Sequence, residues 1–187
     1  MNHDAYDNAY IAGILNSVKT IAMVGASAND VRPSFFVLKY LLAKGFSVFP
    51  INPGHAGKEI LGRTVYARLA NLPGPVDMVD IFRGSEAAPG IVSEALQMNP
   101  RPKVIWMQLG VRNDEAGAEA EAAGLTVVMN RCPKIEYGRL SSEISWMGIN
   151  SRTLSSKRAQ VMGTGVQRMK LERDPAGNAT KNDKDTG

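Results

Sequence analysis

Residues 20–34 read TIAMVGASANDVRPS. Residues 20–24 form a short apolar run that ends at Gly25, as expected of a strand buried on both faces of a sheet. Pro33 and Ser34 then open a segment, residues 34–44, whose apolar residues repeat at helical spacing, and Gly45 ends it. A strand that passes through a glycine turn into a helix is the repeating unit of parallel α/β sheets.

The same alternation continues along most of the chain. Short apolar runs predict four more strands, at residues 46–50, 76–82, 103–107 and 125–129. Apolar residues at helical spacing predict four more helices, at residues 6–18, 86–98, 113–123 and 132–140. Because helices separate the strands, right-handed crossovers and a parallel sheet are expected. The sequence therefore predicts an α/β, Rossmann-like, doubly wound five-stranded parallel sheet with the strand order 3-2-1-4-5.

The charge is unevenly distributed along the 187 residues. Residues 1–140 are expected to form one domain with an N-terminal helix, and residues 141–187 a polar, basic tail with weak or no order. Residues 1–150 carry 14 Lys or Arg and 14 Asp or Glu, so the net charge of +4 arises after residue 150. Because the folded part is neutral, we expect no nucleic-acid partner.

Cysteine use and hydropathy indicate the compartment. Cys132 is the single cysteine, so neither an internal disulfide nor a zinc site with the two histidines is expected. No apolar run approaches the roughly 20 residues that cross a membrane. Residues 1–4 lack the order of a secretory signal, and His3 is expected in a frayed end. We therefore expect a cytoplasmic protein with no membrane partner and no metal.

Open parallel sheets bind ligands outside the carboxyl ends of their strands, where the strand order reverses. The predicted order puts that point between the first and fourth strands. Gly25 permits a tight turn there, and the helix that follows presents backbone N–H groups and a positive dipole end to an anion. Arg32 can add paired, charge-assisted hydrogen bonds to phosphate. The alternative is an ordinary strand-to-helix turn with Ser34 as its cap.

A nicotinamide cofactor fits this stretch less well. The dinucleotide fingerprint requires Gly-x-Gly-x-x-Gly, of which only Gly25 is present, and an acid at the end of the second strand. That place holds Ile51-Asn52-Pro53, which has no carboxylate. A different pyrophosphate ligand is therefore the better candidate.

Six short motifs, each at a predicted strand end, carry a family resemblance. They are Val24-Gly25-Ala26-Ser27, Arg32-Pro33-Ser34, Ile51-Asn52-Pro53, Val79-Asp80-Ile81-Phe82-Arg83, Trp106-Met107-Gln108-Leu109-Gly110 and Asn130-Arg131-Cys132-Pro133-Lys134. In this order, over roughly residues 10–140, they resemble the small bacterial CoA-binding proteins, stand-alone relatives of the CoA-binding domain of the succinyl-CoA synthetase α subunit. The resemblance implies a Rossmann-like fold that holds CoA across the strand ends, and it implies no settled reaction.

The resemblance also implies which residues contact CoA. The pyrophosphate would be held by Gly25, Ala26, Ser27 and Arg32, and the adenosine flanked by Asn52 and Pro53, with Lys58 near a ribose phosphate. The adenine would be walled by Ile81, Phe82 and Arg83, and the pantetheine path lined by Gln108 and Gly110. The alternative for Lys58 is a solvated loop lysine, and for Arg83 an ion pair with Asp80.

Four further residues in or near the predicted strand-end loops are expected to have no direct role in binding. Trp106 fits the core, His55 a solvent-facing loop and Glu136 a salt bridge. Cys132 fits a small apolar filler in a turn, with a competing hypothesis. Arg131 and Lys134 beside it would favour a thiolate, which could form a mixed disulfide with the CoA thiol.

No Ser-His-Asp set, metal triad or facing carboxylate pair is evident in the sequence. The leading hypothesis is therefore a module that binds CoA or acyl-CoA and lacks catalytic machinery of its own. The alternatives are a small NAD(P)-dependent oxidoreductase and a non-catalytic subunit of an acyl-CoA ligase. Ligation by this chain alone is not expected, because the resemblance places the phosphorylated histidine of such enzymes on a further domain. A protein partner or a homo-oligomer stays open.

Overall fold

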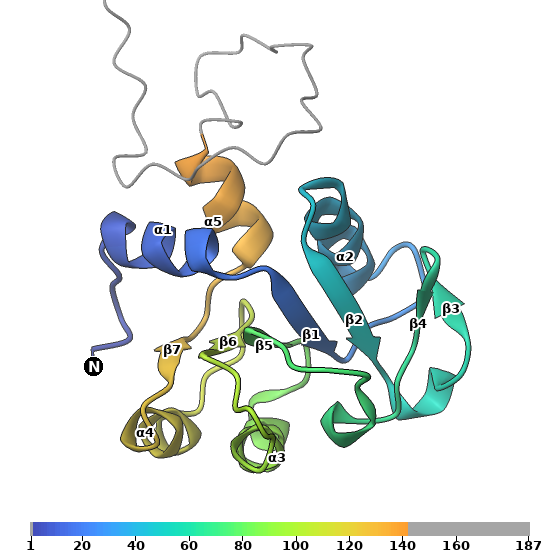
Figure 1. Ribbon diagram of the computed structural model, residues 1–187. Helices are drawn as coiled ribbons and strands as arrows, with labels where there is room; N and C mark the ends of the chain where they lie inside the picture. Colours follow the sequence, from blue (N-terminus) through green and yellow to red (C-terminus); the bar gives the residue numbers. More distant parts are fainter. Residues whose placement is uncertain (1, 142–187) are drawn as a thin grey trace, which may run out of the picture.

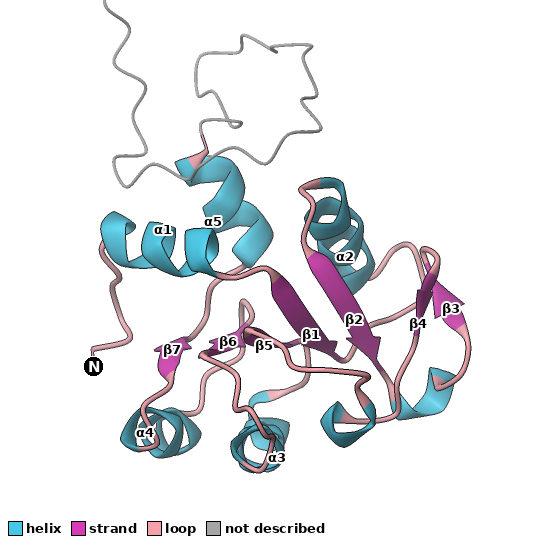
Figure 2. Ribbon diagram, in the orientation of Figure 1, coloured by secondary structure: helices cyan, strands magenta, loops and turns pink. Residues whose placement is uncertain are grey.

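Five parallel strands form the central sheet of the computed structural model, which describes residues 2–141. In spatial order they are β2 (Ser47–Ile51), β1 (Thr20–Val24), β5 (Met78–Ile81), β6 (Val104–Met107) and β7 (Thr126–Val128). Figure 2 shows β1 and β2 pointing the same way, with loops leaving their arrowheads. The expected tail, apart from residue 141, lies outside the described residues.

Helices cover both faces of this sheet (Figure 1). One face carries α1 (Asn8–Ser17), α2 (Pro33–Ala43) and α5 (Pro133–Leu140), and the other carries α3 (Ala88–Leu96) and α4 (Asp114–Ala122). Each face has its own apolar cluster: Leu15, Leu38 and Tyr137 belong to the first, and Val92 and Ala120 to the second. The prediction of a doubly wound, Rossmann-like α/β fold is confirmed, and each predicted helix and strand is present.

Two of these helices have an N-cap residue whose side chain accepts a hydrogen bond from the first turn. Asp7 Oδ1 accepts the Ala9 N–H at 2.7 Å before α1, and Asn113 Oδ1 accepts the Ala116 N–H at 2.9 Å before α4. Each cap satisfies a backbone donor that has no partner within its helix, and this fixes where the helix begins.

One strand occupies a different place from the predicted one. Residues 76–82 are the third strand of the prediction and are expected beyond the second, yet β5 pairs with β1 inside the sheet. The place beyond β2 is taken by Tyr66, which forms a parallel bridge with Ile51. If the bridge at Tyr66 is counted as a third strand, β5 and β6 become the fourth and fifth strands. The order of the first five strands is then 3-2-1-4-5.

Asp77 gives the physical reason for this position. Its Oδ2 accepts the backbone N–H groups of Lys19 at 2.9 Å and Thr20 at 3.0 Å, so the start of β5 is fixed beside β1. Burial alone would raise the pKa of Asp77, but these bonds and one from Lys103 hold it well below its usual range. The carboxylate therefore acts as a charged clamp between two neighbouring strands.

The chain reverses direction across the sheet between β1 and β5. From β1 it passes through α2 to β2 on one side, whereas β6 and β7 extend the sheet on the other side through α3 and α4. The carboxyl ends of all five strands meet along one edge, which we call the carboxyl edge. The remaining elements are the hairpin β3 (Glu59–Ile60) and β4 (Arg63–Thr64) and the 3-10 turns Pro53–His55, Leu69–Asn71 and Ser85–Ala87.

The N-terminal segment packs against β7. The expectation that His3 lies in a frayed end is wrong: its side chain is buried, with Nδ1 2.8 Å from the Tyr6 hydroxyl and Nε2 3.5 Å from Glu121. Tyr6 in turn accepts the Met129 N–H at 2.7 Å. None of the helices in residues 2–141 is long and apolar enough to span a membrane.

Candidate functional site

A groove of about 840 Å³ lies at the carboxyl edge, next to the point where the strand order reverses. Its volume is in the range of small-molecule sites. It is lined by seven residues predicted from the sequence, namely Gly25, Ser27, Arg32, Asn52, Phe82, Arg83 and Gln108. It is also lined by Val31, Pro33, Ser34, Phe36, Val37, Leu109, Val111, Cys132, Lys134 and Ile135.

Gly25 forms the turn between β1 and the groove. Its φ of +93° lies where side chains are strained, and a Cβ there would stand 2.8 Å from the Phe82 carbonyl oxygen and 2.9 Å from Arg83 Cδ. The N–H groups of Gly25 and Ala26 both donate to the Ile51 carbonyl, at 2.9 and 3.2 Å. The first loop is therefore pinned to the end of β2 and packs closely against the loop after β5.

Two helices begin at the groove. Arg32 and Cys132 are the N-cap residues of α2 and α5, and each is followed by a proline. The backbone donors and positive dipole ends of both first turns are thus directed toward the same cavity. This arrangement favours an anionic ligand group.

The charges around the groove have one sign. Arg32, Arg83 and Lys134 line it, and no carboxylate among the described residues does so. Arg32 and Arg83 are exposed and form no ion pair within residues 2–141, so the predicted alternative of an Arg83–Asp80 pair is not what the structure contains. Lys134 Nζ lies 5.8 Å from the centre of the Tyr40 ring. The groove therefore combines three cations with two helix starts.

Asn52 occupies the place where a dinucleotide-binding dehydrogenase carries its acid. Its Nδ2 donates to the Ala26 carbonyl at 2.8 Å, and its Oδ1 accepts the Gly54 N–H at 3.0 Å. Both ends of the amide are thus used to join the first and second loops. The side chain braces the groove and offers no carboxylate to a ribose.

The structure does not bring all predicted site residues to the groove. Ala26 and Ile81 are fully buried, so neither residue is accessible to a ligand in this structure. Pro53, Lys58 and Gly110 are exposed but lie outside the groove lining. Trp106 is fully buried and donates through Nε1 to the Arg131 carbonyl at 2.8 Å, which agrees with the expected core position.

Asp80 was predicted only as a possible ion-pair partner of Arg83, and the structure buries it beneath the groove instead. Asp80, in the middle of β5, is fully inaccessible, and Gln108 Nε2 donates to its Oδ1 and Oδ2 at 3.1 and 3.2 Å. Burial raises the pKa of Asp80 to about 8, although the hydrogen bond from Gln108 opposes this shift. The available signal was an aspartate within the apolar run Met78–Ile81, where a lone carboxyl is unusual.

Cys132 and Glu136 have structural surroundings. Burial raises the pKa of the Cys132 thiol, although the N–H groups of Ile135 and Lys134 and the charge of Lys134 lower it. This direction favours the thiol over the thiolate, and the expected role as a buried filler fits its 7% exposure. Glu136 Oε2 lies 2.6 Å from Arg139 Nη2, in agreement with the expected salt bridge.

The mouth of the groove is apolar. Four of its lining side chains are among the exposed large hydrophobic residues of the described chain, namely Val31, Phe36, Leu109 and Ile135. Their gathering at one cavity suits a ligand that is charged at one end and apolar at another.

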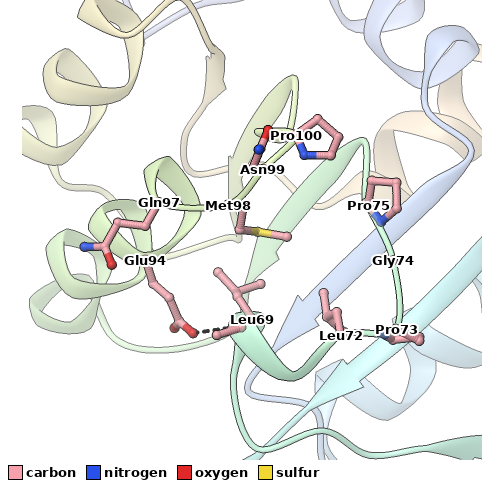
Figure 3. Close-up of a pocket in the computed structure, with 11 residues that line it drawn as sticks. Leu69, Leu72, Pro73, Gly74, Pro75, Glu94, Gln97, Met98, Asn99 and Pro100 are labelled. Atoms are coloured by element: carbon pink, nitrogen blue, oxygen red, sulfur yellow. Dashed lines mark hydrogen bonds between the residues drawn. The ribbon is translucent and has the colours of Figure 1, made fainter.

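A second cavity of about 440 Å³ lies near the opposite ends of the strands, between the Leu69–Pro75 segment and the end of α3 (Figure 3). Glu94 is the one charged side chain among its described lining residues, and its Oε1 accepts the Ala70 N–H at 3.1 Å. Because it offers a carboxylate and no cation, this cavity does not suit a phosphorylated ligand. No cluster of three or more metal-binding side chains occurs among residues 2–141.

Comparison with known proteins agrees with this geometry. Residues 19–138 match the family described as CoA binding domain. The uncharacterized protein YneT of Bacillus subtilis (strain 168) is 36% identical over 129 residues, which cover 69% of this chain and 93% of YneT. A hypothetical protein from Pyrococcus horikoshii OT3 is 36% identical in its solved structure, with a TM-score of 0.69 over 75% of this chain and 96% of that one.

A larger enzyme contains a related segment. The ADP-forming acetate–CoA ligase II of Archaeoglobus fulgidus is 29% identical over 111 residues, which cover 58% of this chain but 16% of the ligase. The family match spans most of the described chain and includes every strand of the sheet and all the loops that line the groove. The protein therefore belongs to the CoA binding domain family.

Proposed function

We propose that this chain binds CoA or acyl-CoA in the groove at the carboxyl edge, without catalytic machinery of its own. The observation that carries the proposal is the charge of the groove, where Arg32, Arg83 and Lys134 face a common cavity that no described carboxylate lines. CoA carries a pyrophosphate and a 3′-phosphate, and such groups are bound by cations and by backbone donors at helix starts.

The pyrophosphate is assigned to the turn Gly25–Ser27 and the first turn of α2. The close approach of Gly25 to Phe82 leaves no room for a Cβ and sets the position of this turn beside the groove. Arg32 precedes α2 directly, so its charge adds to that of the helix dipole. The pantetheine arm is assigned to the other side of the groove, near Gln108 and the apolar side chains of Leu109 and Ile135.

A role as a non-catalytic part of an acyl-CoA ligase is a second candidate. It is favoured by the similarity to a segment that makes up 16% of the ADP-forming acetate–CoA ligase II. In that case the groove would hold CoA while a separate protein performs the chemistry. A nicotinamide cofactor is disfavoured because Asn52, and no acid, ends the second strand and has both polar ends engaged.

Thermal unfolding with a ligand panel tests the proposal. CoA and acetyl-CoA are expected to raise the melting temperature, whereas NAD, NADP and FMN at equal concentration are not, because a ligand stabilises the state that binds it. Titration calorimetry then gives the dissociation constants. Stabilisation by NAD or NADP alone would contradict the proposal, and stabilisation by none of the five would remove a nucleotide ligand from this groove.

A further inference from the structure

Gln108 combines two properties that rarely occur together. It lines the groove directly after β6, yet the residue is buried, with a relative exposure of 5%. Its backbone N–H donates to the Ile81 carbonyl at 3.2 Å, so the residue continues the sheet beyond the end of β6. The amide is therefore held at the floor of the groove by the rigid part of the fold.

One end of this amide is committed to Asp80. Gln108 Nε2 lies 3.1 and 3.2 Å from the two carboxyl oxygens, and no other described side chain donates to Asp80. A buried carboxyl with one neutral donor is costly for stability. In the structure both carboxyl oxygens lie within reach of Nε2, so this edge of the amide is the one turned inward.

The other end of the amide has no partner. Gln108 Oε1 forms no hydrogen bond with the described residues, and it is not among their fully enclosed unpaired atoms. An acceptor at the floor of a groove calls for a donor on the ligand. The groove is also lined by Leu109, Cys132 and Ile135, which suit methylene groups.

We infer that Asp80 is a positioning residue: it holds Gln108 so that Oε1 accepts a hydrogen bond from an amide N–H of the pantetheine arm. This inference rests on the proposed function and deepens it, because it separates recognition of the arm from recognition of the phosphates. Arg32 attracts the charged end of the ligand, which CoA shares with 3′-phospho-ADP. Gln108 and Asp80 recognise the part of CoA that 3′-phospho-ADP lacks.

Titration calorimetry with these two ligands tests the inference. In Gln108→Leu, the dissociation constant for CoA is expected to rise about 5- to 10-fold, because a buried hydrogen bond to the arm is lost. The constant for 3′-phospho-ADP is expected to stay within about 2-fold. Asp80→Leu should give the same selective loss, whereas Asp80→Asn, which keeps a carbonyl oxygen for Nε2, should restore the wild-type ratio of the two constants.

Arg32→Ala is the matched control, because it should weaken both ligands by the same factor. If Asp80→Leu loses its cooperative unfolding transition, Asp80→Ser replaces it, since the shorter side chain cannot reach Gln108. Equal loss of both ligands in Gln108→Leu, or no loss in either, would overturn the inference alone. Failure of both ligands to bind the wild-type protein would overturn the proposed function as well.

Discussion

Gly25 links the backbone conformation of the first loop to the shape of the groove. Its positive φ and its contact with Phe82 exclude a Cβ for two separate reasons. Gly45 offers a comparison, since its φ is +81° but a Cβ there would meet nothing within 4 Å. Comparing the same substitution at the two glycines therefore separates the free-energy cost of backbone strain from the cost of a steric clash.

Gly25→Ala is expected to lower the free energy of unfolding by about 2–5 kcal/mol, because strain and overpacking add. Gly45→Ala should cost about 1–2 kcal/mol from strain alone. Urea denaturation of both variants measures the difference. Equal losses would show that the loop after β5 moves away at little cost and that close approach at Gly25 has no structural weight.

Arg32 is expected to contribute to binding and not to folding. Arg32→Ala should weaken CoA binding by about 1.5–3 kcal/mol, because charge-assisted bonds to phosphate are lost. The unfolding free energy should change by less than about 0.5 kcal/mol, as for other exposed residues. Arg63→Ala, an exposed arginine on β4 outside the groove lining, is the control and should bind CoA as the wild type does. An unchanged affinity for Arg32→Ala would remove this residue from the site.

Asp80 should make stability depend on pH. Its folded-state pKa of about 8 lies above the ordinary value of 3.8, so its contribution is fully present below pH 4 and is lost as pH rises. Between those values the unfolded chain has released the proton that the folded protein retains. The free energy of unfolding therefore falls by about 1.4 kcal/mol per pH unit because of this group.

Asp80→Asn has no proton to lose. The free energy of unfolding of the variant, measured relative to that of the wild type, should therefore increase by about 1.4 kcal/mol per pH unit between pH 5 and pH 7.5. Urea denaturation at several pH values measures it. Parallel pH curves for the two proteins would show that Asp80 titrates alike in the folded and unfolded states.

The sequence could predict which residues reach the groove where their position after a strand decides it, and their role in binding stays a prediction. Gly25 and Gln108 directly follow apolar runs, Arg32 ends the loop after the first of these runs, and all three line the groove. Lys58 and Asp80 show the limit. Lys58 follows β2 as well but is carried away from the groove by the Pro53–His55 turn, and the pairing of Asp80 with Gln108 depends on which strands are neighbours.

At the scale of elements, the sequence predicted which segments form strands better than it predicted the place of each strand in the sheet. Met78–Ile81 is buried on both faces, as an apolar run predicts, but every interior strand has this property. Its neighbour is selected by Asp77, which binds backbone donors at the start of β1. Such a clamp is visible only when both strands are placed, so periodicity alone could not assign β5 to the interior.

Two tyrosine side chains cover part of the outer edge of the sheet, at β7. The Tyr6 hydroxyl accepts the Met129 N–H at 2.7 Å, and the Tyr10 hydroxyl donates to the Val127 carbonyl at 3.2 Å. Edge strands present unpaired backbone groups to other chains, and these side chains cover part of that edge. α1 therefore protects β7 in addition to packing on the sheet.

Tyr6→Phe is expected to lower the free energy of unfolding by about 1–2 kcal/mol, because the Met129 N–H loses its acceptor. Tyr66→Phe is the matched control. Its hydroxyl has no hydrogen bond among the described residues, so its loss should cost less than about 0.5 kcal/mol. Equal stabilities of the two variants in urea would show that water replaces the Tyr6 hydroxyl at this edge without cost.

At the scale of the whole molecule, α5 joins the end of the described chain to its beginning. The family match ends within this helix, at residue 138. α5 closes one cluster through the fully buried Tyr137, and Arg139 Nη1 donates to Asn8 Oδ1 of α1 at 2.7 Å. The last helix is therefore integral to the core.

Deleting residues 151–187 is thus expected to leave the melting temperature within about 4 °C, the shift that about 1 kcal/mol produces, and the CoA dissociation constant within about 2-fold. A deletion from residue 133 onward is the comparison. It removes Tyr137 from the core and Lys134 from the groove, so cooperative unfolding and CoA binding should both be lost. Thermal melting followed by circular dichroism, together with calorimetry, measures both deletions. Loss of the melting transition in the shorter deletion would show that residues after 150 contribute to the fold, because every element of the sheet is still present in that protein.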